Sequence, residues 1–137
     1  MKRIIICFLC CLMLMNSISI VANAYDINEI TSPYYIAIRS KGAGLKEAAA
    51  GLATCTSSFM TNGSQTIKLT MTLVRVENGS NVHVKSWTAS GTGFVSCSQN
   101  WYVATGYTYK VIATANIYDS NGTFIESGSV DSNSVFF

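Results

Sequence analysis

Residues 66–76 read T-I-K-L-T-M-T-L-V-R-V, and their pattern is the clearest indication of the fold class. Its apolar side chains recur at every second position, at Ile67, Leu69, Met71 and Leu73, with lysine or threonine between them. Successive side chains of a β-strand point to opposite faces of a sheet, so a period of two indicates a strand with one buried face. We therefore expect a long strand here, within an all-β chain.

A second long strand is predicted over residues 107–118, where every odd-numbered residue is tyrosine, valine, alanine or isoleucine. Residues 44–50, G-L-K-E-A-A-A, suit either a helical turn or a short edge strand, and we assign them to an edge strand. Shorter segments with the same strand character lie at 34–38, 51–59, 81–89, 93–98 and 123–130.

Asn-Gly dipeptides at 62–63, 78–79 and 121–122 separate several of these segments. Asn-Gly tolerates the positive φ angles of type I′ turns, so each pair is expected to close a β-hairpin. Each is also followed by Ser or Thr, which makes it a formal N-glycosylation acceptor in a host that glycosylates. About seven short strands with such turns predict an antiparallel β-sandwich.

Residues 103–109 read V-A-T-G-Y-T-Y, with Val103 six positions before Tyr109 at the start of the second long strand. This segment resembles the tyrosine corner of immunoglobulin and fibronectin type III domains, in which the tyrosine hydroxyl bonds to backbone a few residues upstream. The resemblance implies an immunoglobulin/fibronectin type III-like sandwich and gives Tyr109 and Val103 the structural roles of that corner.

The chain begins with features of a secretory signal peptide. Lys2 and Arg3 precede an apolar run over residues 4–15, which is shorter than the roughly 20 residues of a membrane-spanning helix. Ala22 and Ala24 then provide the small-x-small pattern of a cleavage site. We expect residues 1–24 to be removed, leaving a secreted β-sandwich domain over residues 25–137 with no membrane insertion.

Two cysteines, Cys55 and Cys97, remain after that cleavage. Exported proteins meet oxidising surroundings, so a single disulfide between them is expected, with a pair of free thiols as the alternative. Counting strands from the resemblance to the tyrosine corner puts the two residues on neighbouring strands of one sheet. An antibody-type disulfide ends two residues after the corner tyrosine, where this chain has Val111.

Charge and composition argue against most catalytic and nucleic-acid functions. Without Lys2 and Arg3, seven of the nine cationic residues remain against seven acidic ones, so the mature chain is neutral. Nucleic acids and anionic membranes require clustered Lys and Arg. The one histidine, His83, lies in an alternating strand and is interpreted as a surface residue. We expect no enzyme activity, no metal site and no cofactor.

Aromatic side chains are the remaining candidates for a binding site, because a flat ring can stack on a sugar or anchor a protein partner. Trp101 and Tyr102 are expected in a loop before the corner, and loops often carry function. The alternation around Val82 and Val84 points Trp87 outward unless a bulge intervenes. The alternative for all three residues is packing at the edge of the core.

The residues from 25 onward also resemble a group of short secreted proteins of unknown function from clostridia and related Gram-positive bacteria. The likeness is carried by Y-Y-I-A-I-R at 34–39, A-T-C at 53–55, V-K-S-W at 84–87 and G-Y-T-Y at 106–109. It implies export and a β-sandwich, but assigns no active residue. We expect a non-catalytic extracellular module that binds a cell-surface glycan or protein, or alternatively a structural protein that assembles with itself.

Overall fold

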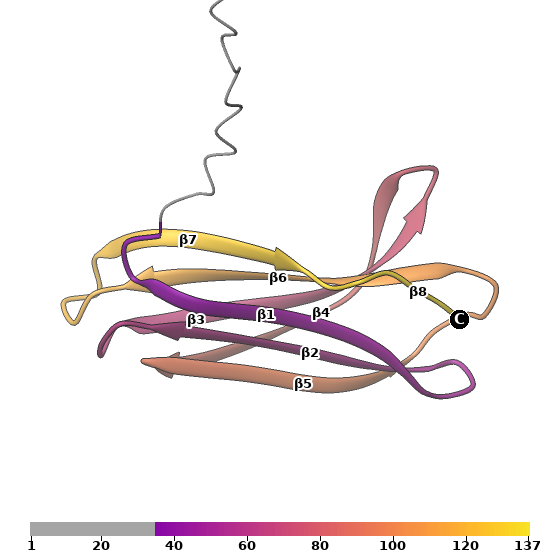
Figure 1. The fold of residues 1–137 in the computed structure, drawn as a ribbon, viewed down its shortest axis with the longest axis horizontal. Coiled ribbons are helices and arrows are strands. Elements are labelled where there is room, and N and C mark those ends of the chain that lie inside the picture. Colours follow the sequence, from indigo (N-terminus) through magenta and orange to yellow (C-terminus); the bar gives the residue numbers. More distant parts are fainter. Residues whose placement is uncertain (1–34) are drawn as a thin grey trace, which may run out of the picture. The chain divides into compact units, whose positions relative to one another are not determined.

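The computed structural model describes residues 35–137, which form an antiparallel β-sandwich, as the sequence predicts (Figure 1). The predicted signal peptide, its cleavage site and residues 25–34 lie outside the described residues. The strands are β1 (Ile38–Ala49), β2 (Leu52–Thr61), β3 (Thr66–Glu77), β4 (Ser80–Thr92), β5 (Phe94–Tyr102), β6 (Thr108–Tyr118), β7 (Phe124–Asp131) and β8 (Val135–Phe136).

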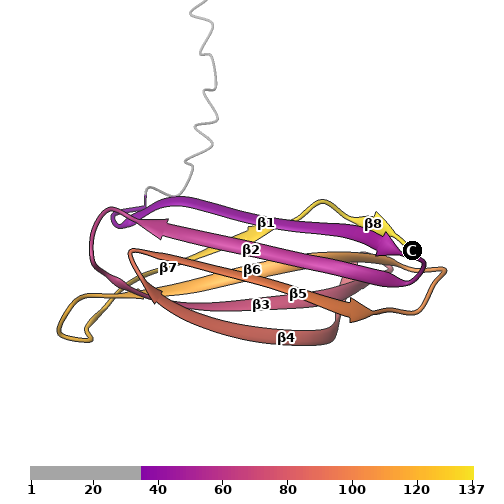
Figure 2. The ribbon, with the colours of Figure 1, turned by 90° about the horizontal axis from the view of Figure 1, so that it is seen from below.

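The strands form two antiparallel sheets. One has three strands in the order β1-β2-β5, and the other has the order β4-β3-β6-β7, with β8 added to β6. Figure 2 shows β1, β2 and β5 side by side in one layer, in front of the other sheet. In this view β4 lies beyond β5, along the edge of the three-stranded sheet. The chain passes between the sheets three times, from β2 to β3, from β4 to β5 and from β5 to β6.

The core lies between the sheets and is built from the alternating side chains that the sequence indicated. Ile67, Leu69, Met71 and Leu73 of β3 are fully buried, because every second residue of that strand faces the other sheet. The odd-numbered residues of β6 from Tyr109 to Ile117 are buried in the same way. The two long strands are hydrogen-bonded neighbours in an uninterrupted register.

The tyrosine at the start of β6 is tied to the preceding loop. The Tyr109 hydroxyl donates a hydrogen bond of 2.8 Å to the carbonyl of Ala104, and its ring packs edge-on against Phe137 at a centroid distance of 5.6 Å. Val103 is partly buried against the core. This is the contact that a tyrosine corner requires.

The start of β1 is held by a carboxylate from β7. The Glu126 side chain accepts hydrogen bonds from the backbone N–H groups of Ile36, Ala37 and Ile38 at 2.9, 2.8 and 2.7 Å. Ala37 and Ile38 belong to the buried core, so these bonds position the first strand where it joins the sandwich.

Several segments differ from the sequence-based expectation. The predicted edge strand at 44–50 is the second half of the long strand β1, while residues 35–37 precede that strand. Asn78 and Gly79 do form a two-residue hairpin turn, with φ of 50° and 78°. The Asn-Gly pair at 121–122 lies in a longer hairpin loop, and the pair at 62–63 lies where the chain crosses between sheets, so it closes no hairpin.

Candidate binding site at the edge between β4 and β5

Trp87 faces the space between the sheets, not the solvent as the alternation around Val82 had suggested. Leu73 of β3 pairs with Lys85, whereas the next residue, Val74, pairs with His83, so Val84 is an extra residue in β4. Such a bulge shifts the alternation by one residue. Lys85 and Trp87 consequently turn inward, and Trp87 packs against the core.

Trp101 lies at the end of β5 and also faces inward, opposite the fully buried Ala53 of β2. Its ring meets that of Trp87 edge-on, with centroids 6.1 Å apart and planes at 74°. Edge-to-face contacts of this kind contribute about 0.5–1.5 kcal/mol beyond burial. The structure thus brings together two of the three predicted aromatic residues, from different sheets.

A cation completes this cluster. The Lys85 ammonium lies 4.8 Å from the centroid of the Trp101 ring, within the range of a cation–π contact. Within residues 35–137, Lys85 has no carboxylate at salt-bridge distance. We refer to Lys85, Trp87 and Trp101 as the edge cluster.

Tyr102 is separate from the edge cluster. It is the last residue of β5, pairs with Leu52, and points to the outer face of the three-stranded sheet. Its exposed fraction is 76%, against 38% for Trp101. Trp101 and Tyr102 were expected in a loop, but both belong to a regular strand, whose alternation sends them to opposite faces.

The edge cluster is accessible because the two sheets differ in width. Met71 of β3 is fully buried, whereas Trp87, its neighbour on β4, is only partly buried. The same difference separates buried Leu69 from Ala89. The three-stranded sheet therefore covers β3 but leaves the inner face of β4 incompletely covered, as the position of β4 beyond β5 in Figure 2 illustrates.

The chemistry of the cluster is that of binding: two rings for stacking and one cation. His83 lies nearby on β4, exposed, with its Nε2 3.0 Å from the Ser86 hydroxyl. In the part of the chain that the structure describes, no three His, Cys, Asp or Glu side chains gather as a metal site would require. Nor do the described residues form a helix long and apolar enough to cross a membrane.

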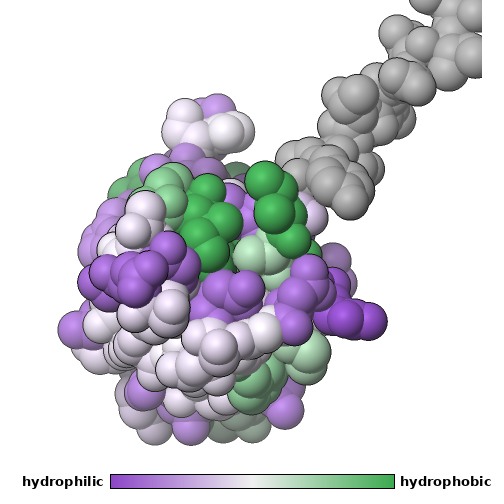
Figure 3. All heavy atoms as spheres, turned by 90° about the vertical axis from the view of Figure 1, so that its left-hand side faces the viewer, coloured by the Kyte–Doolittle hydropathy of each residue, from purple (hydrophilic) through white to green (hydrophobic). Residues whose placement is uncertain are grey.

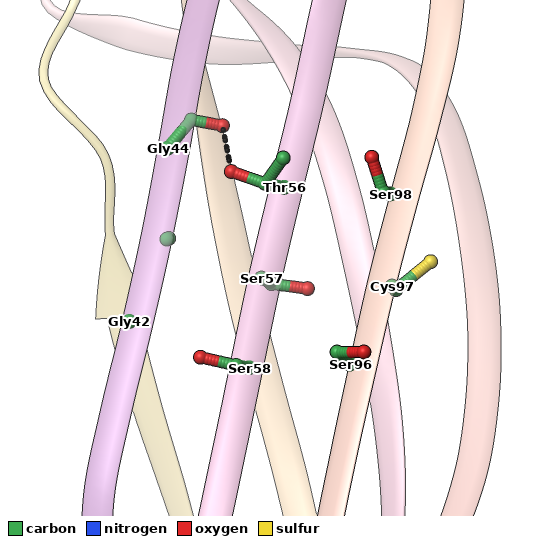
Figure 4. A pocket seen from close by; sticks show the side chains of 9 residues that line it. Gly42, Gly44, Thr56, Ser57, Ser58, Ser96, Cys97 and Ser98 are labelled. Atoms are coloured by element: carbon green, nitrogen blue, oxygen red, sulfur yellow. Dashed lines mark hydrogen bonds between the residues drawn. The ribbon is translucent and has the colours of Figure 1, made fainter.

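The predicted disulfide is not formed in the structure, where Cys55 and Cys97 are buried free thiols. They lie on neighbouring strands as expected, but Cys55 is opposite Gln99, and Cys97 is opposite Ser57. Such diagonal neighbours are about 7–8 Å apart, and a disulfide requires Cβ atoms about 4 Å apart. In Figure 4 the Cys97 sulfur points away from β2, which carries Cys55.

Both thiols are held in the neutral form. Burial, together with the nearby Cys97 thiol, raises the pKa of Cys55 to about 11. Burial also raises the pKa of Cys97. Because the thiolate is the nucleophile, neither residue has the character of a reactive cysteine.

A second surface feature is a shallow hollow of about 420 Å³ on the outer face of the three-stranded sheet. Small residues create it, and the Thr56 hydroxyl in it donates to the Gly44 carbonyl at 3.4 Å (Figure 4). It has hydroxyl groups but no charged side chain or ring. Its lining consists of Gly42, Ala43, Gly44, Thr56, Ser57, Ser58, Ser96, Cys97 and Ser98.

Other exposed apolar side chains form small groups away from the edge cluster. Met60 and Phe94 pair across β2 and β5, at the end of β5 opposite Trp101, and are 42% and 52% exposed, while Phe124 of β7 is 53% exposed. At the end of the sandwich seen in Figure 3, apolar side chains stand in separate groups among polar ones. Small exposed apolar groups are ordinary on protein surfaces, so these carry less weight than the edge cluster.

No protein-family model matches the chain, and no curated protein is significantly similar to it. No ligand or residue role can therefore be transferred from a relative. The geometry of the edge cluster is the remaining basis for a function.

Proposed function

We propose that the domain is a non-catalytic, extracellular binding module, and that its glycan or protein ligand contacts the edge cluster. The observation that carries the proposal is the pair Trp87–Trp101, in which a partly exposed ring is supported edge-on by a second ring and flanked by an unpaired lysine. A rigidly supported aromatic side chain is typical of the residues that dominate binding energy.

The chain contains two tryptophans, and both lie in the edge cluster, so intrinsic fluorescence reports on this site directly. We expect isolated Gram-positive cell walls to change the fluorescence of the exported domain. Walls stripped of protein by protease would separate a glycan ligand from a protein ligand. The Trp101→Ala variant should bind at least about tenfold more weakly, because a central aromatic contact contributes over 1 kcal/mol.

Tyr102→Ala is the matched control, since it removes the adjacent exposed ring from the opposite face of β5. It should bind like the unmodified domain. Equal weakening by both substitutions, or full binding by a folded Trp101→Ala variant, would contradict the proposed site. Unfolding of Trp101→Ala would instead assign the ring to the core, and the conservative Trp101→Phe variant would then test binding.

Export is part of this proposal and is supported by the signal-like residues 1–24. The mass of the exported protein should correspond to a chain beginning at Tyr25. A retained lipid, or a start more than a few residues away, would contradict it.

Self-assembly at the cell surface is the second candidate, and the unpaired edge of β5 is the observation that favours it. Light scattering over a range of concentrations distinguishes the two: a mass that rises with concentration indicates assembly, and a constant monomer mass argues against it.

A further inference from the structure

The free side of β5 presents a regular row of unpaired backbone groups. Thr61 N–H donates to the Gly93 carbonyl at 2.9 Å, and Val103 N–H donates to the Gly51 carbonyl at 2.8 Å. Gly93 and Val103, the odd-numbered residues that flank β5, thus direct a backbone C=O and a backbone N–H towards the β2 side. The register between β2 and β5 has no shift, so the N–H and C=O groups of even-numbered residues point to the free side. These residues are Phe94, Ser96, Ser98, Asn100 and Tyr102.

The other edge strands carry features that discourage pairing with a further strand, and β8, which pairs with β6 beside β7, is only two residues long. β1 has Lys41 and Lys46 together with two register shifts. β4 has the bulge at Val84, and β7 has a register shift at its start and an inward-pointing Glu126. Charges and bulges of this kind protect exposed edges from strand addition.

β5 has none of these features. Its sequence, F-V-S-C-S-Q-N-W-Y, contains no charged residue and no proline, and its pairing is regular throughout. Among the edges of the described sandwich, it is the one best suited to accept another strand.

A strand added next to β5 would lie over the part of β4 that the three-stranded sheet leaves partly uncovered. Such a strand would cover Trp87 and Ala89. At the Phe94 end β4 lies so close to β5 that a Cβ on Gly91 would collide with the Phe94 carbonyl. The available edge therefore runs over residues 96–102, from the exposed Ser96 to the edge cluster.

We propose that β5 accepts an extended segment of a partner polypeptide as a fourth strand of the three-stranded sheet, along residues 96–102, with an acidic side chain of that segment beside Lys85. This inference rests on the proposed function and specifies the ligand class. The backbone row supplies hydrogen bonds, and the edge cluster supplies side-chain contacts. The unpaired ammonium of Lys85 favours an acidic partner residue at this end.

An isolated segment fits better than a second folded copy. Two copies joined antiparallel through β5 would be related by a two-fold axis perpendicular to the sheet. β4 lies next to the free edge of β5, in the other sheet. The two-fold axis would therefore bring β4 of one copy against β4 of the second copy. A single extended segment avoids this conflict.

The probe is a fluorescein-labelled peptide of eight residues that alternates threonine and valine, with a glutamate at each end. A second peptide carries N-methyl groups on alternate residues, which remove the N–H donors of one edge and keep the side chains. On the protein, Ser98→Pro removes one free-side N–H and leaves the pairing with β2 intact, and Ser98→Thr is its matched control.

We expect the first peptide to bind the unmodified domain and Ser98→Thr equally, and to bind Ser98→Pro at least tenfold more weakly. The N-methylated peptide should bind at least tenfold more weakly to the unmodified domain. Equal binding of both peptides, or of the peptide to folded Ser98→Pro and Ser98→Thr, overturns strand addition. If Ser98→Pro does not fold, strand addition is tested by comparing the binding of the two peptides to the unmodified domain.

The two proposals fail in different ways. If a soluble cell-wall polysaccharide quenches the tryptophan fluorescence of the unmodified domain and Ser98→Pro alike, and the peptide does not bind, strand addition is wrong and the edge cluster remains a binding site. If the peptide binds by backbone pairing and Trp101→Ala has no effect on any ligand, the role of the edge cluster is wrong. If the domain remains monomeric, self-assembly through β5 is also excluded.

Discussion

The hydroxyl of Tyr109 and the carbonyl of Ala104 are joined by a 2.8 Å hydrogen bond that ties the loop after β5 to the strand β6. The ring is almost completely buried, so its hydroxyl depends on this protein partner. Replacing Tyr109 by Phe keeps the packing against Phe137 and removes the bond. We expect a loss of about 0.5–1.5 kcal/mol in the free energy of unfolding.

Chemical denaturation measures this loss. Tyr118→Phe is the control, because that residue is half-buried at the end of the same strand and its hydroxyl forms no side-chain hydrogen bond in the described part of the chain. Similar stability changes for the two variants would show that the bond to Ala104 contributes nothing particular. Binding at the edge cluster should survive both substitutions.

Glu126 makes the attachment of β1 dependent on pH. Partial burial pushes the pKa of this carboxyl up, and the N–H groups of Ile36, Ile38 and Ala37 push it down by more, so its pKa lies below the usual range. A lowered pKa stabilises the folded state at pH values above the pKa of the unfolded chain. That contribution is lost as the pH falls through the folded-state value.

The difference in stability between the unmodified domain and Glu126→Gln should therefore be largest near neutral pH, at about 1 kcal/mol, and should shrink below about pH 4. Thermal unfolding from pH 3 to pH 7 measures it. Hydrogen exchange should show faster opening of residues 36–38 in the variant at neutral pH. A difference that grows on acidification would contradict the sign of this argument.

Cys55 and Cys97 should be unreactive in the folded protein. With the pKa of Cys55 at about 11 and that of Cys97 also raised, little thiolate exists at pH 8. A thiol reagent should label the folded domain slowly and label both cysteines on unfolding in guanidinium. If no thiol appears after unfolding without a reductant, and the mass is two hydrogens lower, the pair is oxidised and the register in the structure is wrong.

Gly91 is required by the close approach of β4 to β5. A Cβ at this position would collide with the backbone carbonyl of Phe94, which cannot move as a flexible side chain can. Gly91→Ala should lower stability by about 1–3 kcal/mol. Gly42→Ala is the matched control, since its Cβ would make an ordinary contact of 3.6 Å with the Ser58 hydroxyl. Equal effects of the two substitutions in thermal unfolding would contradict this account.

Local sequence patterns are enough to predict the two long strands β3 and β6 and the faces that they bury. Alternation is a local property, and the buried residues of β3 and β6 follow it without exception between Ile67 and Leu73 and between Tyr109 and Ile117. The hairpin at Asn78 and Gly79 could also be predicted, because that pair has the φ preferences of the turn. The all-β sandwich follows from these local signals.

Which residues meet depends on how distant strands pair and pack. The extra residue at Val84 carries no glycine or other local signal, and it alone turns Trp87 towards Trp101. The two-residue offset between Cys55 and Cys97 depends on how β2 and β5 align over a long sequence separation. The open edge next to β5 exists because one sheet has fewer strands than the other. Register and sheet width result from the pairing of distant segments, and no single stretch of sequence contains them.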